Sequence, residues 1–251
     1  TADSIYYDMR SGYSEAFGNI VYSDTINRNM LTGGYAYMNE LVDSAYVTGR
    51  ALVADYSRND TLFMHSDTIW TVSYNLGTDS LYRKVKAYNK VRAWGKEMQA
   101  VCDSLVFDSR DTCMTMYKDP ILWNKDVQLL GEEVRVYMDS TSIDWVHIIS
   151  QTLYGEPMDS VNYNQIRGKE MQFFFNDGKL SEMQVIGSVQ IVFFPLDDDS
   201  LYVGMNTTSA GRAVAFIKDG QVDKVVVPKE ASGVFYPMSQ RPMAERYLDN
   251  F

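Results

Sequence analysis

The amino-acid sequence predicts an all-β fold, built from stacked antiparallel strand repeats around an apolar interior. Three observations support this fold class. Apolar and polar residues alternate over short runs, these runs are rich in β-forming residues (18 Tyr and 11 Phe among 251 residues), and turn signals separate them closely. Helical spacing is almost absent. We expect only a short helical or irregular tail over 242–251, opened by Pro242 at a position that tolerates proline.

The clearest strands lie in the middle and later parts of the chain. Alternation is strong over Ser104–Asp108, Glu133–Met138 and Gly187–Phe193. Two tetrapeptides, Asn176–Lys179 and Lys218–Gln221, carry Asp-Gly at their centres. Glycine supplies the positive φ that a type I′ turn requires, so both tetrapeptides predict tight hairpins.

Recurring motifs predict a repeat. An Asp-Ser/Thr-apolar triplet is expected to open strands, because Asp and Ser side chains bond their own nearby backbone; the triplets begin at Asp3, Asp24, Asp60, Asp67, Asp79, Asp103, Asp159 and Asp199. A glycine closes successive units at Gly33, Gly49, Gly131, Gly168 and Gly211. The segments Val134–Ile148, Met171–Ile186 and Ala213–Val227 align as strand, polar turn and strand. Units of roughly 30–40 residues are typical of stacked repeats, and we expect one continuous domain over residues 1–251.

Composition excludes several classes of protein. The chain has 33 Asp+Glu against 23 Lys+Arg, a net charge of −10, which argues against a nucleic-acid partner. A hydrophobic fraction of 45% excludes intrinsic disorder. No window approaches the run of about 18 apolar residues that a transmembrane helix needs, so we expect no transmembrane segment.

Signatures of catalysis and metal binding are missing. The two histidines, His65 and His147, lack the spaced His, Cys or Glu partners of a zinc site, and Asp197–Asp199 lacks the glycine and distant Glu of a calcium loop. We therefore expect no enzyme activity, no metal and no cofactor. Cys102 could pair with His147 as nucleophile and base, but any chain with both residue types offers that pairing.

The two cysteines could form a disulfide or remain thiols. A turn centred near Arg110 would place Cys113 opposite Phe107 and away from Cys102. A disulfide needs Cα atoms within about 7 Å, so we expect thiols.

The order of the motifs resembles a known family. Glu15–Ile20, followed by Asp24 and Leu31–Gly33, is similar to the OstA/LptA-like repeat, which reads approximately a-x-G-N-V, then D, then L-x-G. Asn59–Thr68 and Val91–Trp145 resemble the Bacteroidetes OstA-like branch, and the resemblance covers essentially the whole chain. The Gly-Asn pair is incomplete in two later units, at Asn89-Lys90 and Lys118-Asp119, where we expect irregular repeats.

The resemblance implies an elongated, twisted β-jellyroll, often called a β-taco, that works in the periplasm, with an association with the outer membrane as a further expectation. It also implies a non-enzymatic carrier or bridge that moves lipopolysaccharide, or a related glycolipid, toward that membrane. Other jellyroll domains of the export bridge would be partners by edge-strand addition, with head-to-tail self-association as a further expectation. The chain begins at Thr1 without a leader, so a removed signal peptide and a trimmed end both fit. The resemblance also leaves open that repeats which precede this point in relatives are missing here.

The alternating apolar side chains are candidates for the groove that would hold acyl chains. The set comprises Leu105, Phe107, Met114, Met116, Ile121, Trp123, Val134, Val136, Met171, Phe173, Phe175, Val189, Ile191 and Phe193. Burying an acyl chain gains about 0.8 kcal/mol per CH₂ group, so such a groove would bind lipid without polar contacts. The same residues also fit a closed core, in which case the protein would be a scaffold of the cell envelope that docks partners through its surface and edges.

Overall fold

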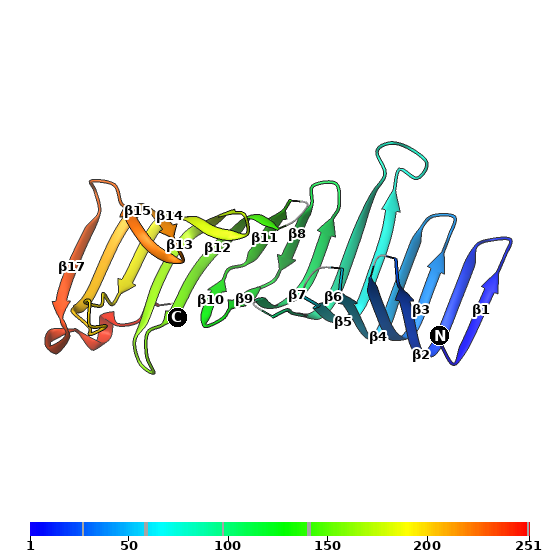
Figure 1. Cartoon of the computed structure of the whole chain (residues 1–251), viewed down its shortest axis with the longest axis horizontal. Coiled ribbons are helices and arrows are strands. Elements are labelled where there is room, and N and C mark those ends of the chain that lie inside the picture. Colours follow the sequence, from blue (N-terminus) through cyan, green and yellow to red (C-terminus); the bar gives the residue numbers. More distant parts are fainter. Residues whose placement is uncertain (27, 58–59, 97, 140–141, 250) are drawn as a thin grey trace. The chain divides into compact units, whose positions relative to one another are not determined.

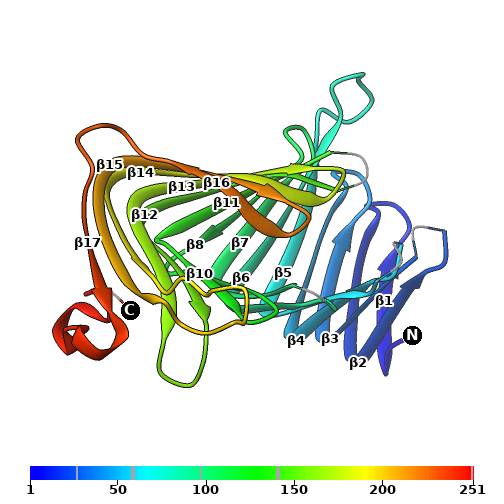
Figure 2. The same ribbon diagram turned by 60° about the vertical axis from the view of Figure 1, so that its left-hand side comes forward.

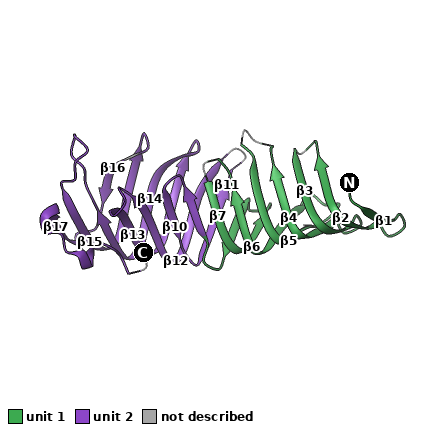
Figure 3. Ribbon diagram, turned by 90° about the horizontal axis from the view of Figure 1, so that it is seen from below, with its two compact units in different colours: residues 1–120 green, residues 121–251 purple. Residues whose placement is uncertain are grey.

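The structure, a computed structural model, describes residues 1–251 except 27, 58–59, 97, 140–141 and 250. It is nearly all β, with stacked antiparallel strands, which confirms the predicted fold class. The chain forms two compact units, Thr1–Pro120 and Ile121–Phe251, coloured separately in Figure 3. None of the helical segments in the described ranges has the length and apolar character needed to cross a membrane.

In unit 1, each strand pairs with the next in antiparallel fashion, and Figure 1 shows these strands side by side. The strands are β1 (Ser4–Asp8), β2 (Tyr13–Asp24), β3 (Asn29–Asn39), β4 (Ser44–Asp55), β5 (Leu62–Tyr74), β6 (Tyr82–Trp94), β7 (Met98–Asp108) and β8 (Cys113–Tyr117).

Unit 2 continues the antiparallel pattern with longer strands, several of which visibly bend (Figure 2). Its elements are β9 (Ile121–Asn124), β10 (Val127–Leu130), β11 (Glu133–Met138), β12 (Ile143–Pro157), β13 (Tyr163–Asn176), β14 (Lys179–Phe193), β15 (Gly204–Lys218), β16 (Gln221–Val226), β17 (Ser232–Pro237), and the 3₁₀ helices η1 (Met238–Gln240) and η2 (Met243–Glu245). Strands β10 and β11 pair with the two halves of β12, and β16 and β17 pair with the two halves of β15.

The long strands bend at a repeated corner. The pairing register shifts there, and every second strand carries two consecutive residues with positive φ. In unit 1 these pairs are Gly18-Asn19 on β2, Gly49-Arg50 on β4 and Asn89-Lys90 on β6; in unit 2 they are Ser150-Gln151 on β12 and Gly187-Ser188 on β14. A bulge of this kind adds a residue to one strand and bends it, so each long strand contributes to two half-sheets.

The corner geometry also holds where the sequence motif is incomplete. Asn89 and Lys90 have φ values of 61° and 54°, and Lys118 and Asp119 have the same two values. The expectation of irregular repeats at these positions was wrong. A non-glycine residue pays about 1–2 kcal/mol for this conformation, which the surrounding pairing must offset.

Turn signals were located correctly at the tight hairpins and less well elsewhere. Asp177-Gly178 and Asp219-Gly220 link their strands with positive φ at both residues, which confirms the two predicted hairpins. The triplets at Asp67 and Asp103 do not open strands but lie at corners inside β5 and β7. Three further triplets also differ from expectation: Asp24 ends β2, while Asp159 and Asp199 lie in connections between strands. The short helix η2 follows Pro242, as the sequence indicates.

The hairpin between β7 and β8 decides the state of the cysteines. Cys113 lies opposite Asp108, one residue from the predicted position opposite Phe107, and Cys102 lies opposite Val91. Both cysteines are buried and no disulfide joins them.

Candidate functional site

One apolar row crosses the first half-sheet of unit 1. Directly opposed residues on neighbouring strands share a face of the sheet. This row consists of Ile5, Ala16, Ala36, Val47, Ile69, Ala87, Leu105 and Met116. Burial increases along it, from Ile5 at 63% exposed to Met116 at 1%. The row is therefore solvent-exposed at its β1 end and packed at its β8 end.

The second half-sheet of unit 1 carries a similar row beyond the corner. It consists of Tyr22, Leu31, Val53, Met64, Ala93 and Ala100. Tyr22 is 56% exposed, Leu31, Val53 and Met64 are half-buried, and Ala100 is buried. We call these two rows together the inner face of unit 1. Its second row is incompletely covered from Tyr22 on β2 to Met64 on β5, whereas its first row is already buried from Val47 on β4 onward.

Unit 2 differs, because its corresponding rows are closed. One consists of Val134, Ile148, Met171, Val185 and Ala213, and the next of Val136, Val146, Phe173, Met183 and Ala215. Every one of these side chains is at most 9% exposed. They form a packed core that leaves water no access.

The structure distributes the sequence-predicted groove residues over several environments. Leu105, Met116, Val134, Val136, Met171, Phe173 and Val189 are buried, Phe107, Met114, Phe175 and Ile191 are half-buried, and Phe193 is exposed.

Ile121 and Trp123 do not share a face with Ile191. The register links Leu122 through Leu129, Tyr154 and Ile166 to Ile191, so the neighbours of Leu122 along β9 point to the opposite side.

Sequence reasoning missed the half-buried apolar residues in the second row of unit 1. Leu31, Val53 and Met64 stand outside the predicted set, although all three lie in strands. The reason lies at the corners, where β3 and β5 each contribute one residue against two on the neighbouring strand, so that the alternation changes phase on β3 and β5. The run Ala51–Ala54 on β4 is apolar throughout and therefore shows no alternation in the sequence.

Other chemistry-bearing side chains have structural partners. His147 Nε2 lies 2.9 Å from Glu170 Oε2, and Trp145 stacks on Tyr137 with ring centroids 4.3 Å apart. Burial raises the pKa of the Cys102 thiol to about 11, which disfavours the nucleophilic thiolate. Across the described ranges, no group of three or more His, Cys, Asp or Glu is placed to hold a metal ion.

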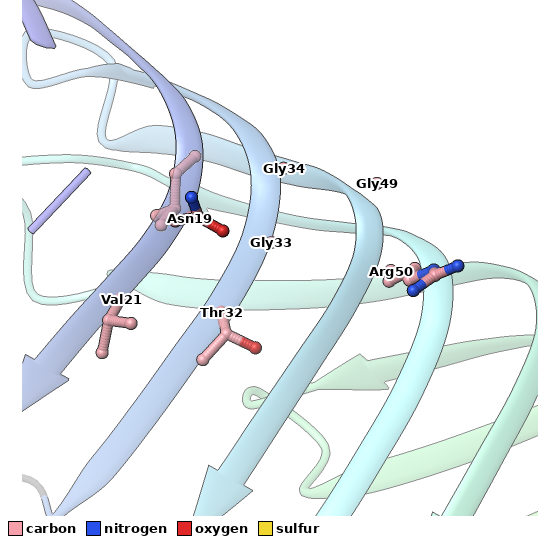
Figure 4. A pocket seen from close by; sticks show the side chains of 8 residues that line it. Asn19, Val21, Thr32, Gly33, Gly34, Gly49 and Arg50 are labelled. Atoms are coloured by element: carbon pink, nitrogen blue, oxygen red, sulfur yellow. The ribbon is translucent and has the colours of Figure 1, made fainter. Parts of the chain in front are cut away.

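A hollow of about 390 Å³ lies at the corner of unit 1 (Figure 4). It is lined by Asn19, Ile20, Val21, Thr32, Gly33, Gly34, Gly49 and Arg50. In Figure 4, β2, β3 and β4 curve side by side at these residues.

Comparisons with known proteins add one distant similarity. No protein-family model matches the chain, and no curated protein matches it. Among solved structures, the chain is similar to LptH, the LptA-homologous periplasmic component of the lipopolysaccharide transport device of Pseudomonas aeruginosa. The identity is 15% and the TM-score 0.42, over 56% of this chain and 95% of the other.

Proposed function

We propose that the protein is a non-enzymatic carrier that holds acyl chains of lipopolysaccharide, or of a related glycolipid, against the inner face of unit 1. The observation that carries this proposal is the incomplete burial of that face. A monomeric soluble protein rarely exposes large contiguous apolar surface unless it binds something there.

The chemistry of the inner face suits a flexible apolar ligand. Val53 and Leu31 supply branched aliphatic surface, while Met64 has an unbranched, polarizable side chain that adapts to irregular shapes. Each acyl CH₂ removed from water would contribute about 0.8 kcal/mol, so one chain along several strands would bind without a polar anchor.

The setting of this activity is also part of the proposal. A carrier of lipopolysaccharide would work in the periplasm and pass its cargo toward the outer membrane. Other jellyroll domains would extend it by adding strands to its edges, which needs only main-chain hydrogen bonds. Strand β1 is suited to this role, because it pairs with β2 along one edge. Its sequence also carries no proline or lysine that would block the addition of a strand to its other edge.

The packed core of unit 2 favours a second candidate function. If both units close in the same way in solution, the protein would be a scaffold that docks partners through its surface. Under the carrier proposal, by contrast, acyl chains should reach the inner face of unit 1 and should be excluded from the closed rows of unit 2.

Site-specific photocrosslinking to lipopolysaccharide tests the carrier. A photoreactive amino acid at Val53 or Met64 is expected to crosslink. The same probe at Leu52 or His65, neighbouring positions on the opposite face, should not crosslink and serves as the matched control. Equal labelling on both faces, or none, would refute the carrier and leave the scaffold. A probe at Phe173 is expected to remain unlabelled, because that side chain is buried in the core of unit 2.

A further inference from the structure

Aromatic side chains gather around one carboxylate on the outer face of unit 1, the face opposite the inner face. Glu15 on β2 lies directly opposite Tyr6 on β1 and Tyr37 on β3. Successive residues of a strand point to opposite faces, so Glu15 points away from the inner face, to which its neighbour Ala16 belongs. The rings on the same face as Glu15 form what we call the aromatic cluster, which consists of Tyr6, Tyr13, Phe17, Tyr35, Tyr37 and Tyr46.

The aromatic cluster is one connected surface. The centroid of each ring lies 5.2–6.2 Å from that of at least one other ring of the cluster. Tyr6 and Phe17 are 55% and 45% exposed, and the other four rings are half-buried. The cluster therefore presents ring surface to solvent across the four strands β1 to β4.

Glu15 has no cation as a partner. Its Oε1 accepts a hydrogen bond of 2.5 Å from the Tyr35 hydroxyl, and its bond with Tyr13 raises the pKa of that tyrosine to about 12. A carboxylate has about four acceptor positions, so two tyrosine hydroxyls leave capacity for a further donor. Throughout the described part of the chain, no Lys or Arg forms an ion pair with Glu15.

The same sheet face contains a carboxylate and an aromatic ring with an ammonium group in place. Lys84 Nζ on β6 lies 2.9 Å from Asp108 Oδ2 and 5.9 Å from the ring centroid of Tyr82. The cross-strand row of Lys84 and Asp108 reaches β2 at Tyr13, so this lysine and the aromatic cluster share the outer face. Glu15 and its rings offer the same chemistry without a lysine of this chain to complete it.

We propose that the aromatic cluster binds a lysine side chain supplied by a partner protein. The ammonium group donates to Glu15 and is attracted by the surrounding ring faces. The four-carbon stem lies along the exposed rings, because lysine buries its methylene groups against apolar surface. The net charge of −10 attracts a basic partner over a longer range. The proposal does not depend on lipid carriage, because the cluster and the inner face lie on opposite sides of the sheet.

Titration of the full chain with the peptide acetyl-Gly-Lys-Gly-amide, followed by NMR of the backbone amides, tests the site. Saturable shifts are expected at residues 13–17, 35–37 and 46, and none with the same peptide acetylated at the lysine Nζ. Glu15→Gln should weaken binding about tenfold, because it removes a charge-assisted hydrogen bond. Asp79→Asn removes one negative charge from an exposed connection of unit 1; it is the matched control and should leave binding unchanged.

Variants of Tyr37 test the aromatic ring. Tyr37→Leu should weaken binding about threefold to fivefold, and Tyr37→Phe, which retains a ring, should bind the peptide more tightly than Tyr37→Leu. Wild-type affinity in either Glu15→Gln or Tyr37→Leu would overturn the site, as would equal binding of the acetylated peptide. Choline binding more tightly than the lysine peptide would overturn the assignment to lysine.

Discussion

Gln165 Nε2 on β13 donates a hydrogen bond of 2.9 Å to the carbonyl oxygen of Arg246, 81 residues away in the sequence. The other end of the same amide, Gln165 Oε1, accepts a bond of 2.9 Å from the amide of Leu248. Gln165 is fully buried, so one side chain fixes two backbone groups of the C-terminal segment onto unit 2.

Replacing this amide should release the C-terminal segment. Gln165→Leu leaves the Arg246 carbonyl and the Leu248 amide without partners, and an unsatisfied buried group costs about 1–3 kcal/mol. We expect the free energy of unfolding in urea to fall by about 2–4 kcal/mol. Gln190→Leu, a half-buried amide in the adjacent strand, should change it by less than about 0.5 kcal/mol. Equal losses in both variants would contradict this role for Gln165.

Acid stability should depend on Asp159. The hydroxyl of Tyr202 donates to this carboxylate at 2.6 Å, and the amides of Val161 and Asn162 donate as well, which holds the pKa of Asp159 well below its usual range. A lowered folded pKa gives stability that is present above the unfolded pKa of about 3.9 and is lost as the pH falls toward the folded value. Asp159→Asn should therefore be less stable than wild type at pH 7, and the difference should shrink below about pH 4.

The measurement is urea unfolding at several pH values between 7 and 2. Asp198→Asn, in the exposed connection after β14, is the control and should leave the pH dependence unchanged. A constant difference between Asp159→Asn and wild type across this range would exclude the linkage.

The cysteines should behave as two buried thiols. Because burial raises the pKa of Cys102 to about 11, we expect iodoacetamide to modify it slowly in the folded protein at pH 8. In denaturant without reductant, mass spectrometry should show two added alkyl groups. An unchanged mass under those denaturing conditions would instead reveal a disulfide.

Self-association should depend on the open edge of β1. The Asp3 amide bonds inward to β2, and alternation along the strand then turns the Tyr6 amide outward. Tyr6→Pro removes an outward donor without removing a β1–β2 hydrogen bond. We expect concentration-dependent, end-to-end assembly of the wild type by sedimentation, with a partner edge near Ala213–Val227, and a monomer for Tyr6→Pro.

Two comparisons make this assembly experiment decisive. Tyr6→Val keeps the amide and should assemble like the wild type. Assembly of Tyr6→Pro at wild-type concentrations would refute the edge as the contact. The partner segment Ala213–Val227 contains two exposed valines on β16, Val222 and Val225, which are the next positions to substitute in the same assay.

The sequence by itself determined the strand content, the tight hairpins and the recurrence of corners. Those features are local: Asp177-Gly178 requires only its own φ values, and the alternation over Glu133–Met138 requires only the pleat of one strand. The single Gly18-Asn19 pair was visible too, whereas Asn89-Lys90 and Lys118-Asp119 adopt the same backbone without the motif, because the neighbouring strands impose it.

Only the tertiary structure decided which apolar side chains are covered. At each corner one strand contributes two residues against one on its neighbour, and the alternation changes phase on that neighbour. Met64 therefore shares a face with Val53 and Ile69, which no single period through β5 predicts. Val136 and Ile5 are both apolar residues in strands, yet one is buried and the other is 63% exposed. Burial depends on what packs above a strand, and strands far apart in sequence supply that cover. The buried Gln165 amide bonded to Arg246 depends for the same reason on a contact that no local pattern contains.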